Sequence, residues 1–334
     1  MPVIDGGGTV TDLFFLDAGT QNVTIDHLTF QNCVSSAIHL NGYRTSTSDG
    51  TIRGCVISNN TIQFVTGSTS GGAGGTGGIR GTFAVENNTI RNNLITDTTG
   101  PSITLVGGSA GETISGNTIS FNECLRSNTS NLADTGGIYL LDRGHNASSA
   151  LQNVIDNNYV EGIGTSADTR LIYLDDETSK VLISNNVLTG SASSALQLHG
   201  SDHVAVTNNI IDLTGMSYIG LYQDDASSGF INYGMAGNTF QTNIVYSGGA
   251  FASSALWAFN NGSGDAIATP ATSRNLYYST GPALPSGGTI VDSSPATENP
   301  LFTNASGRDY SFTGTSGTAL IGFAAIDQAK IGPQ

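Results

Sequence analysis

The sequence predicts an all-β solenoid in which short parallel strands wind into about nine to ten stacked coils. Three observations support this fold class. A short asparagine motif recurs along most of the chain. The segments between the motifs alternate apolar and polar residues and are rich in Val, Ile and Thr, while no segment shows a sustained helical period with caps. One coil cannot bury its apolar side alone, so the coils above and below it must complete the core.

The recurring motif is a small polar residue, Asn, any residue and then an apolar residue. The asparagines at its second position are Asn60, Asn88, Asn117, Asn158, Asn186, Asn209, Asn238 and Asn275. Their intervals run from 23 to 41 residues; the shortest corresponds to one turn of a three-sided coil, and the longer ones include loops. Because neighbouring strands lie about 4.8 Å apart, an Asn at the same corner of every coil can hydrogen-bond to the next one. We therefore expect one Asn ladder along the solenoid.

A second strand precedes each asparagine motif, and these strands can be aligned by their apolar alternation. Each contains a quartet whose first and third residues are mostly Leu or Ile and should point inward, so the second and fourth residues face outward. The second-position column reads Phe15, His39, Arg80, Thr104, Tyr139, Tyr173, Gln197, Tyr222 and Trp257. The fourth-position column includes Asp175, His199 and Asp224.

Side chains with an aromatic ring and a polar tip dominate one half of the second-position column. Such a row suits sugar rings, because their C–H faces stack on aromatic rings while their hydroxyls need polar partners. We expect a groove there, with substrate bound by Tyr139, Tyr173, Gln197, Tyr222 and Trp257. The alternative is that these rings pack beneath the loops contained in the long intervals.

Acidic residues with one histidine mark the candidate catalytic site. Asp175 and Asp224 share a column two coils apart, with His199 between them, which places their backbones about 9.6 Å apart. Paired carboxylates roughly 6.5–9.5 Å apart are the arrangement of inverting glycosidases. Asp176 follows Asp175, and Asp142 falls one coil earlier at the register of Asp176. Crowded carboxylates raise one another's pKa, which favours a general acid, and His199 can accept, donate or orient a proton.

Two other interpretations of the acidic residues stay open. Asp-Asp followed closely by Thr or Ser is good turn chemistry at a strand end, where side-chain oxygens cap backbone N–H groups. Clustered carboxylates also make calcium sites, although the sequence contains no EF-hand loop. The nearest cations in the alignment are Arg80 and Arg143, which we expect to contact the substrate.

The composition narrows the function. The 334-residue chain has a net charge of 11 − 26 = −15, so it lacks the basic patch that nucleic-acid binding needs. No apolar run approaches the roughly 18 residues of a membrane span. The sequence opens with Met1 and Pro2 and no signal peptide, from which we expect a trimmed start within a longer protein. Cys33, Cys55 and Cys124 have no metal-ligand spacing and are expected to be buried free thiols.

Three stretches carry a resemblance to a known family. Residues 171–179, residues 196–202 and the tail segment 299–327 look like parts of right-handed parallel β-helix (pectate-lyase-like) carbohydrate-active proteins, closest to secreted bacterial β-helix glycoside hydrolases. The resemblance implies the right hand of the helix. In a related β-helix xylosidase family the nucleophile corresponds to Asp175, whereas the acid, a Glu in that family, corresponds to His199 here. We expect a parallel β-helix domain over residues 1–290 and a C-terminal capping segment, 291–334, packed on it.

These observations favour a secreted enzyme that cleaves glycosidic bonds of a polysaccharide or oligosaccharide by hydrolysis. Its expected catalytic residues are Asp175, Asp224, His199, Asp142 and Asp176. No cofactor is required, with calcium as the alternative, and neither nucleic acid nor membrane is an expected partner. A lyase or uronate C5-epimerase is the alternative activity, with His199 or Tyr173 as the base and Arg143 or calcium neutralising a substrate carboxylate. A non-catalytic glycan-binding adhesin or tail-spike module is the third hypothesis.

Overall fold

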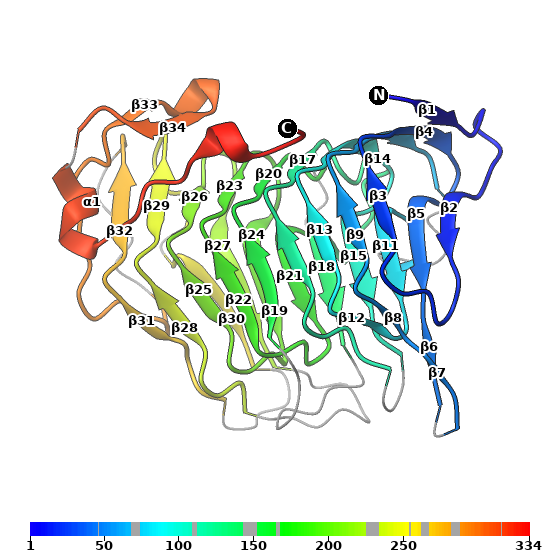
Figure 1. The fold of residues 1–334 in the computed structure, drawn as a ribbon. Coiled ribbons are helices and arrows are strands. Elements are labelled where there is room, and N and C mark those ends of the chain that lie inside the picture. Colours follow the sequence, from blue (N-terminus) through cyan, green and yellow to red (C-terminus); the bar gives the residue numbers. More distant parts are fainter. Residues whose placement is uncertain are drawn as a thin grey trace.

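The protein is an elongated stack of short strands, shown in Figure 1 as a computed structural model. The structure describes residues 1–45, 47–67, 74–108, 112–142, 152–164, 168–224, 234–253, 255–261, 267–281, 288–314 and 316–334. Three long parallel sheets run along the stack, and successive strands of the chain pass from one sheet to the next. The longest sheet has ten strands, so the expected all-β solenoid of about nine to ten coils is confirmed.

We call the three long sheets sheet 1, sheet 2 and sheet 3, in the order of their first strands. Sheet 1 contains β1 (Val3–Asp5), β4 (Thr29–Cys33), β10 (Thr61–Val65), β14 (Leu94–Thr98), β17 (Glu123–Leu125), β20 (Tyr159–Glu161), β23 (Val187–Thr189), β26 (Ile210–Asp212), β29 (Ile244–Ser247) and β32 (Leu276–Ser279). Sheet 2 contains β2 (Asp12–Leu16), β5 (Ser36–Asn41), β11 (Gly77–Thr82), β15 (Ile103–Val106), β18 (Thr135–Leu141), β21 (Thr169–Asp175), β24 (Ser194–His199), β27 (Tyr218–Gln223) and β30 (Trp257–Asn260). Sheet 3 contains β3 (Thr24–Asp26), β9 (Val56–Ser58), β13 (Thr89–Arg91), β16 (Thr118–Ser120), β19 (Asn153–Asp156), β22 (Val181–Ser184), β25 (Ala205–Thr207), β28 (Thr239–Gln241) and β31 (Ala271–Ser273).

Short elements complete the fold. Two-stranded sheets are formed by β6 (Tyr43–Arg44) with β7 (Asp49–Gly50), by β8 (Ile52–Arg53) with β12 (Val85–Glu86), and by β33 (Phe302–Asn304) with β34 (Asp309–Phe312). The helices of the described residues are η2 (Ala305–Gly307), α1 (Ser316–Ile321) and η3 (Gln328–Lys330). None of them is long and apolar enough to cross a membrane.

The interior of the solenoid is filled by the inward residues of all three sheets. Strand residues such as Ile172, Leu174 and Ile183 are fully buried there, and the three cysteines lie buried and unpaired as expected. Each inward side chain packs between its counterparts one coil above and one coil below. The solenoid is therefore stabilised chiefly by contacts between neighbouring coils.

The asparagines form two ladders, not one. The main ladder precedes sheet 1 and consists of Asn60, Asn93, Asn122, Asn158, Asn186, Asn209, Asn243 and Asn275, each Nδ2 donating to the next Oδ1 over 2.9–3.0 Å. A shorter ladder at the start of sheet 3 strands runs from Asn88 to Asn117 and Asn153. The assignment of Asn88, Asn117 and Asn238 to the main column is therefore wrong. The same motif occurs at two corners of one coil, five residues apart, and the sequence does not distinguish them.

The predicted register of sheet 2 is correct up to β24 and wrong in the last two strands. Leu196 pairs with Gly220 and not with Leu221, and Gly220 pairs in turn with Trp257. A Cβ on Gly220 would lie 2.6 Å from Cζ3 of Trp257, so the absent side chain makes room for the indole. Because a slip of one residue exchanges the two faces of a strand, Tyr222 and Trp257 point into the core.

The chain after β32 runs back along the outer face of sheet 1, as the orange and red segments of Figure 1 show. Tyr310 is buried and its hydroxyl donates to Oδ2 of Asp212 over 2.8 Å. Further along the tail, Asn208 donates to the carbonyl of Ala324 (2.8 Å), and Gly332 donates to the carbonyl of Phe121 (2.8 Å). The tail covers a cluster of apolar residues on sheet 1, which contains Leu125 and the aligned column Tyr159, Val187, Ile210, Ile244 and Leu276.

Candidate active site

The candidate active site lies on the outer face of sheet 2, on the neighbouring strands β18, β21 and β24. Tyr139, Tyr173 and Gln197 stand side by side across these strands, as the sequence predicts. Asp175 ends β21 and His199 ends β24, so both side chains lie at the carboxyl ends of adjacent strands. This face is separate from the solenoid core, because Tyr139, Leu141 and Tyr173 form a cluster of their own.

Asp175 is the centre of the site. Its side chain is only 7% exposed and accepts three hydrogen bonds. Nδ1 of His199 lies 2.7 Å from Oδ1, the backbone N–H of Asp176 donates to the same oxygen (3.0 Å), and the hydroxyl of Tyr139 donates to Oδ2 (2.5 Å). Burial alone would raise the pKa of the Asp175 carboxyl, but the hydrogen bonds from His199 and Tyr139 outweigh it and lower that pKa. Asp175 is therefore ionised at neutral pH in a site that water barely reaches.

The two tyrosines position carboxylates and do not form an open stacking surface. Their rings meet edge to face, with centroids 5.2 Å apart, and are 4% and 2% exposed. Burial and the negative charge of Asp175 raise the pKa of both hydroxyls far above the ordinary value, so both stay protonated and donate. The hydroxyl of Tyr173 donates to Oδ1 of Asp134 over 3.0 Å. Of the two interpretations of this row, covered rings describe Tyr139 and Tyr173 better than an exposed groove.

Asp134 belongs to the site although the sequence analysis did not include it. It directly precedes β18, has a left-handed backbone (φ 53°) and is exposed as a residue, while its carboxyl meets Tyr173. The partial loss of water around its carboxyl and the charge of Asp175 raise the pKa of Asp134. The only sequence signal is its place directly before the strand that opens with Thr135, Gly136 and Gly137.

The turn after β21 holds Asp175 in place through its backbone. Asp176 and Glu177 are both left-handed, with φ of 39° and 66°, a conformation that Asp adopts more readily than Glu. Thr178 donates its hydroxyl to the carbonyl of Asp175 (2.6 Å), and Ser179 donates to the carbonyl of Glu177 (2.7 Å). Turn capping, one of the open interpretations, is thus present at this turn. Asp175 takes part in it through the Asp176 N–H and also contacts His199 and Tyr139.

One group of side chains in the described part of the chain has the spacing of a metal site. Asp175, Asp176 and His199 each offer a ligand atom within 4.8 Å of the others. These ligand atoms already form hydrogen bonds. Both oxygens of Asp175 accept hydrogen bonds, and Nδ1 of His199 donates one of them. Calcium takes six to eight oxygen ligands, and one of the three ligand atoms of this group is a histidine nitrogen.

The remaining predicted residues lie elsewhere or take other roles. Asp142 is buried and follows Leu141, which pairs with Asp175. Arg80 is on β11, three strands from β21, and the charge that acts on it is that of Asp12. Arg143 lies outside the described residues.

Three further predictions depend on the misaligned register and are corrected. His199 pairs with Gln223, so Asp224 does not share the column of Asp175. Asp224 is buried, and its backbone N–H donates to the carbonyl of Asn260. Tyr222 is fully buried in the core, with its hydroxyl bonded to backbone carbonyls, and Trp257 packs beside it. Neither aromatic residue faces a substrate.

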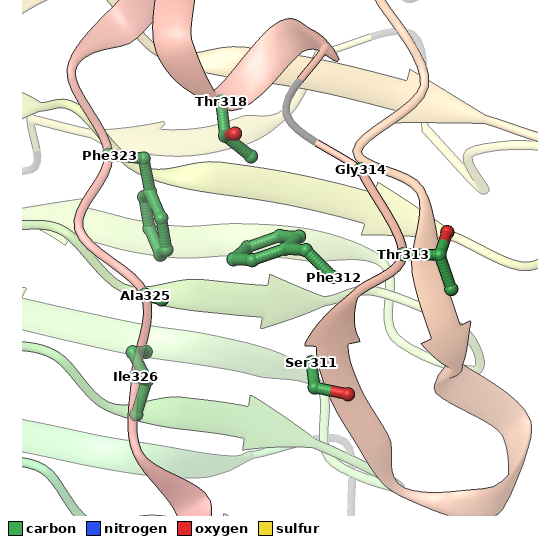
Figure 2. A pocket seen from close by; sticks show the side chains of 8 residues that line it. All are labelled: Ser311, Phe312, Thr313, Gly314, Thr318, Phe323, Ala325 and Ile326. Carbon is green, nitrogen blue, oxygen red and sulfur yellow. The ribbon is translucent and has the colours of Figure 1, made fainter.

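Surface hollows lie on the C-terminal tail and between the tail and sheet 1. Figure 2 shows one of them, lined by Phe312, Phe323 and Ile326 and by no titratable side chain. Another lies between the tail and sheet 1, where Arg308 pairs with Glu161 (2.6 Å) and Tyr310 bonds Asp212. Its charged groups are partnered with one another, which indicates a role in fixing the tail.

Comparison with known proteins supports this architecture. The family described as "Right handed beta helix region" matches residues 14–211, well over half of the chain, and the protein belongs to that family. The right hand of the helix, expected from resemblance, is thereby confirmed. No curated protein matches the sequence.

Solved structures of similar fold include two carbohydrate-related proteins. The complex of XylC with xylose is 14% identical with a TM-score of 0.50, over 89% of this chain and 51% of that one. The A-module of the mannuronan C-5 epimerase AlgE4 from Azotobacter vinelandii is 14% identical with a TM-score of 0.42, over 84% and 71%. This chain thus spans about half the length of XylC. At this identity the likeness is one of fold.

Proposed function

We propose that the protein hydrolyses glycosidic bonds of a neutral polysaccharide or oligosaccharide, with Asp175 as the nucleophile. The observation that carries the proposal is a buried carboxylate kept ionised by His199 and Tyr139 on the outer face of a β-helix. The transition state of glycoside hydrolysis resembles an oxocarbenium ion. A fixed negative charge in a nearly dry site stabilises such a cation strongly, because water screens it little.

Other parts of the site support a sugar substrate. Oε1 of Gln197 is buried beside Tyr173 and has no hydrogen-bond partner among the described residues. Buried acceptors are almost always satisfied, and a sugar hydroxyl is a suitable donor. The fold relative XylC was solved with xylose, which makes xylan and xylo-oligosaccharides the first substrates to test. We place the reaction outside the cell, as part of the proposal.

The charges around the site favour a neutral substrate over a uronate. Asp134, Asp142, Asp168 and Asp176 come from the same strands as Asp175 or from positions directly next to them. Arg170, the arginine of β21, is already bonded to Asp168 (2.8 Å) and to backbone and hydroxyl oxygens. A polyuronate would be repelled by these carboxylates.

One observation favours a second candidate. His199 is oriented by a carboxylate, as in a general base, and a tyrosine hydroxyl lies beside it, so a proton could be removed from C5 of a uronate. That reaction defines a lyase or C5-epimerase. It differs from hydrolysis in its products, so both can be measured in one experiment.

The experiment is incubation of the protein with neutral and uronic polysaccharides, with and without a calcium chelator. We expect new reducing ends from a neutral polysaccharide, no ultraviolet absorbance of unsaturated uronate, and no effect of the chelator. Asp175→Asn should remove the activity, and Asp17→Asn, the same change at the exposed residue that follows β2, should retain it. If the products are unsaturated or epimerised uronates, the protein is a lyase or an epimerase and not a hydrolase. If it binds a polysaccharide and forms no product, it is an adhesin.

A further inference from the structure

We propose that Asp134 is the catalytic acid that protonates the departing sugar oxygen, and that Tyr173 holds it beside Asp175. This inference rests on the proposed function, because it supplies the proton that hydrolysis at Asp175 requires. It also replaces the role predicted for Asp224, which the register of β27 moves out of the Asp175 column.

The geometry brings the two carboxyls to one hydroxyl. Tyr173 donates to Oδ1 of Asp134 over 3.0 Å, and it is also one of the hydrogen-bonding neighbours that lower the pKa of Asp175. The hydroxyl has one proton, so it can serve only one carboxylate at a time. When Asp134 is protonated, the proton of Tyr173 can turn to Asp175. Both carboxyls therefore meet the same hydroxyl, and we propose the retaining mechanism, in which the two carboxyls lie closer together than in inverting enzymes.

The backbone explains how Asp134 reaches this place. Strand β18 begins with Thr135, Gly136 and Gly137 and pairs with β21 in one continuous register. A Cβ on Gly136 would lie 3.0 Å from Cβ of Tyr173, and one on Gly137 would lie 2.8 Å from Val160 in the core. The two glycines therefore allow the chain to approach Tyr173 on one side and the core on the other, immediately after Asp134.

Exposure separates the roles of the two carboxyls. Asp134 is exposed as a residue and can reach the oxygen of an arriving glycoside, whereas the side chain of Asp175 is 7% exposed. The titratable groups that face Asp134 are Asp175, Asp168, His199 and Tyr173. The loss of water around the Asp134 carboxyl raises its pKa most, the charges of Asp175 and Asp168 add to this rise, and the Tyr173 hydrogen bond and the charge of His199 oppose it. One carboxyl with a raised pKa beside one with a lowered pKa is the arrangement that separates acid from nucleophile.

The proposed reaction balances in two steps. Asp134 gives its proton to the glycosidic oxygen while the bond from C1 to that oxygen breaks, its electron pair staying on the oxygen, and Asp175 forms an ester bond to C1. In the second step the Asp134 carboxylate takes a proton from water, the water oxygen bonds to C1, and the ester bond breaks to restore Asp175. The net reaction consumes one water, and the sugar keeps its anomeric configuration.

Leaving-group dependence tests the role of Asp134. We would compare 4-nitrophenyl xyloside with xylobiose, or the corresponding pair for whichever neutral sugar the polysaccharide panel identifies. The nitrophenolate leaves without a proton, whereas the sugar alcohol needs one. Asp134→Asn should slow cleavage of the disaccharide by about 10²- to 10⁴-fold and change formation of the ester from the nitrophenyl glycoside far less. Added azide should restore turnover by attacking the ester in place of activated water.

A second readout needs no substrate. The carboxyl of Asp134, followed by carbon NMR, should titrate above the usual aspartate value in the wild-type protein. Asp175→Asn should lower the pKa of Asp134 by removing a negative charge, and Tyr173→Phe should raise it by removing a donor to the ionised form. Asp17→Asn is the control that should change neither the NMR titration nor the activity.

The outcomes distinguish this inference from the proposed function. If the wild-type protein hydrolyses glycosides and Asp134→Asn slows both substrates equally or neither, Asp134 is not the acid, although hydrolysis at Asp175 stands. An Asp134 carboxyl that titrates at or below the usual value, and ignores both Asp175→Asn and Tyr173→Phe, would overturn the inference in the same way. If the wild-type protein cleaves no glycoside, the proposed function fails and this step fails with it.

Discussion

The hydrogen bond from Tyr139 to Asp175 makes a quantitative prediction about stability. Tyr139→Phe removes the donor to Oδ2 and keeps the ring that packs against Tyr173. A hydrogen bond to a charged group contributes about 1.5–3 kcal/mol, against about 1 kcal/mol for a neutral pair. We therefore expect the variant to lose about 1.5–3 kcal/mol of unfolding free energy at pH 7, where Asp175 is ionised.

The sign of the pH dependence follows from the direction of the pKa shift. The pKa of Asp175 is lowered in the folded protein, so its charge stabilises the fold above the pKa of an unfolded aspartate, and this contribution is lost as pH falls through the folded-state pKa. The difference between wild type and Tyr139→Phe should be full at pH 7 and should shrink toward about 1 kcal/mol once acid protonates Asp175.

Urea unfolding followed by fluorescence is a suitable assay, because Trp257 is the single tryptophan and is buried. Tyr43→Phe is the matched control, since Tyr43 is 46% exposed and its loss should change stability by less than about 0.5 kcal/mol. An equal loss at pH 7 and at acidic pH, or no loss at pH 7, would refute the claim that Tyr139 stabilises a charged Asp175.

Two further predictions concern the scaffold. Asn186→Ala removes the acceptor of the Asn158 backbone N–H (2.9 Å) and the donor to the Ile155 carbonyl (2.9 Å), so two buried backbone groups lose this partner. At about 1–3 kcal/mol each, this should cost about 2–6 kcal/mol in urea unfolding, and a loss below 1 kcal/mol would contradict the ladder's role. Gly220→Val should clash with the indole of Trp257 and cost about 1–3 kcal/mol, with a shift of tryptophan emission; unchanged emission and stability would contradict the observed register.

The fold could be predicted from the sequence because its signals repeat. The Asn motif and the apolar alternation recur in almost every coil, so an error in one coil does not change the architecture. The column from Phe15 to Gln197 was predicted correctly for the same reason, since Ile or Leu marks the inward positions in most of these strands. The same repetition hid the second ladder, because Asn88 and Asn93 carry the same local signature.

The register failed where one residue departs from the pattern. Gly220 occupies an inward position that apolar residues fill in most of the other coils, and its space is taken by Trp257 from the next strand. The missing side chain and the indole that fills its space belong to different coils. The alternation of apolar and polar residues within one strand therefore cannot reveal it. Aligning Leu221 as the inward residue turned Tyr222 outward and placed Asp224 in the column of Asp175.

Part of the site could be predicted and part could not. Asp175 and His199 follow regular strands, and their contact depends only on the register. Asp134 directly precedes β18 and lies outside the repeating strand pattern, so no periodic feature shows that its carboxyl meets Tyr173. Burial of Tyr139 and Tyr173 was an open alternative, because an outward position in a strand does not determine what covers it.

Trapping of the covalent intermediate tests the central claim most directly. The protein would be incubated with a 2-deoxy-2-fluoro glycosyl fluoride of the sugar it releases, and the modified peptide identified by mass spectrometry. We predict one added fluorosugar, bound as an ester to Asp175 in the segment 171–179, and no label in Asp175→Asn. A label on another residue, or steady hydrolysis with inversion at C1 and no trapped ester, would contradict the assignment of Asp175 as the nucleophile.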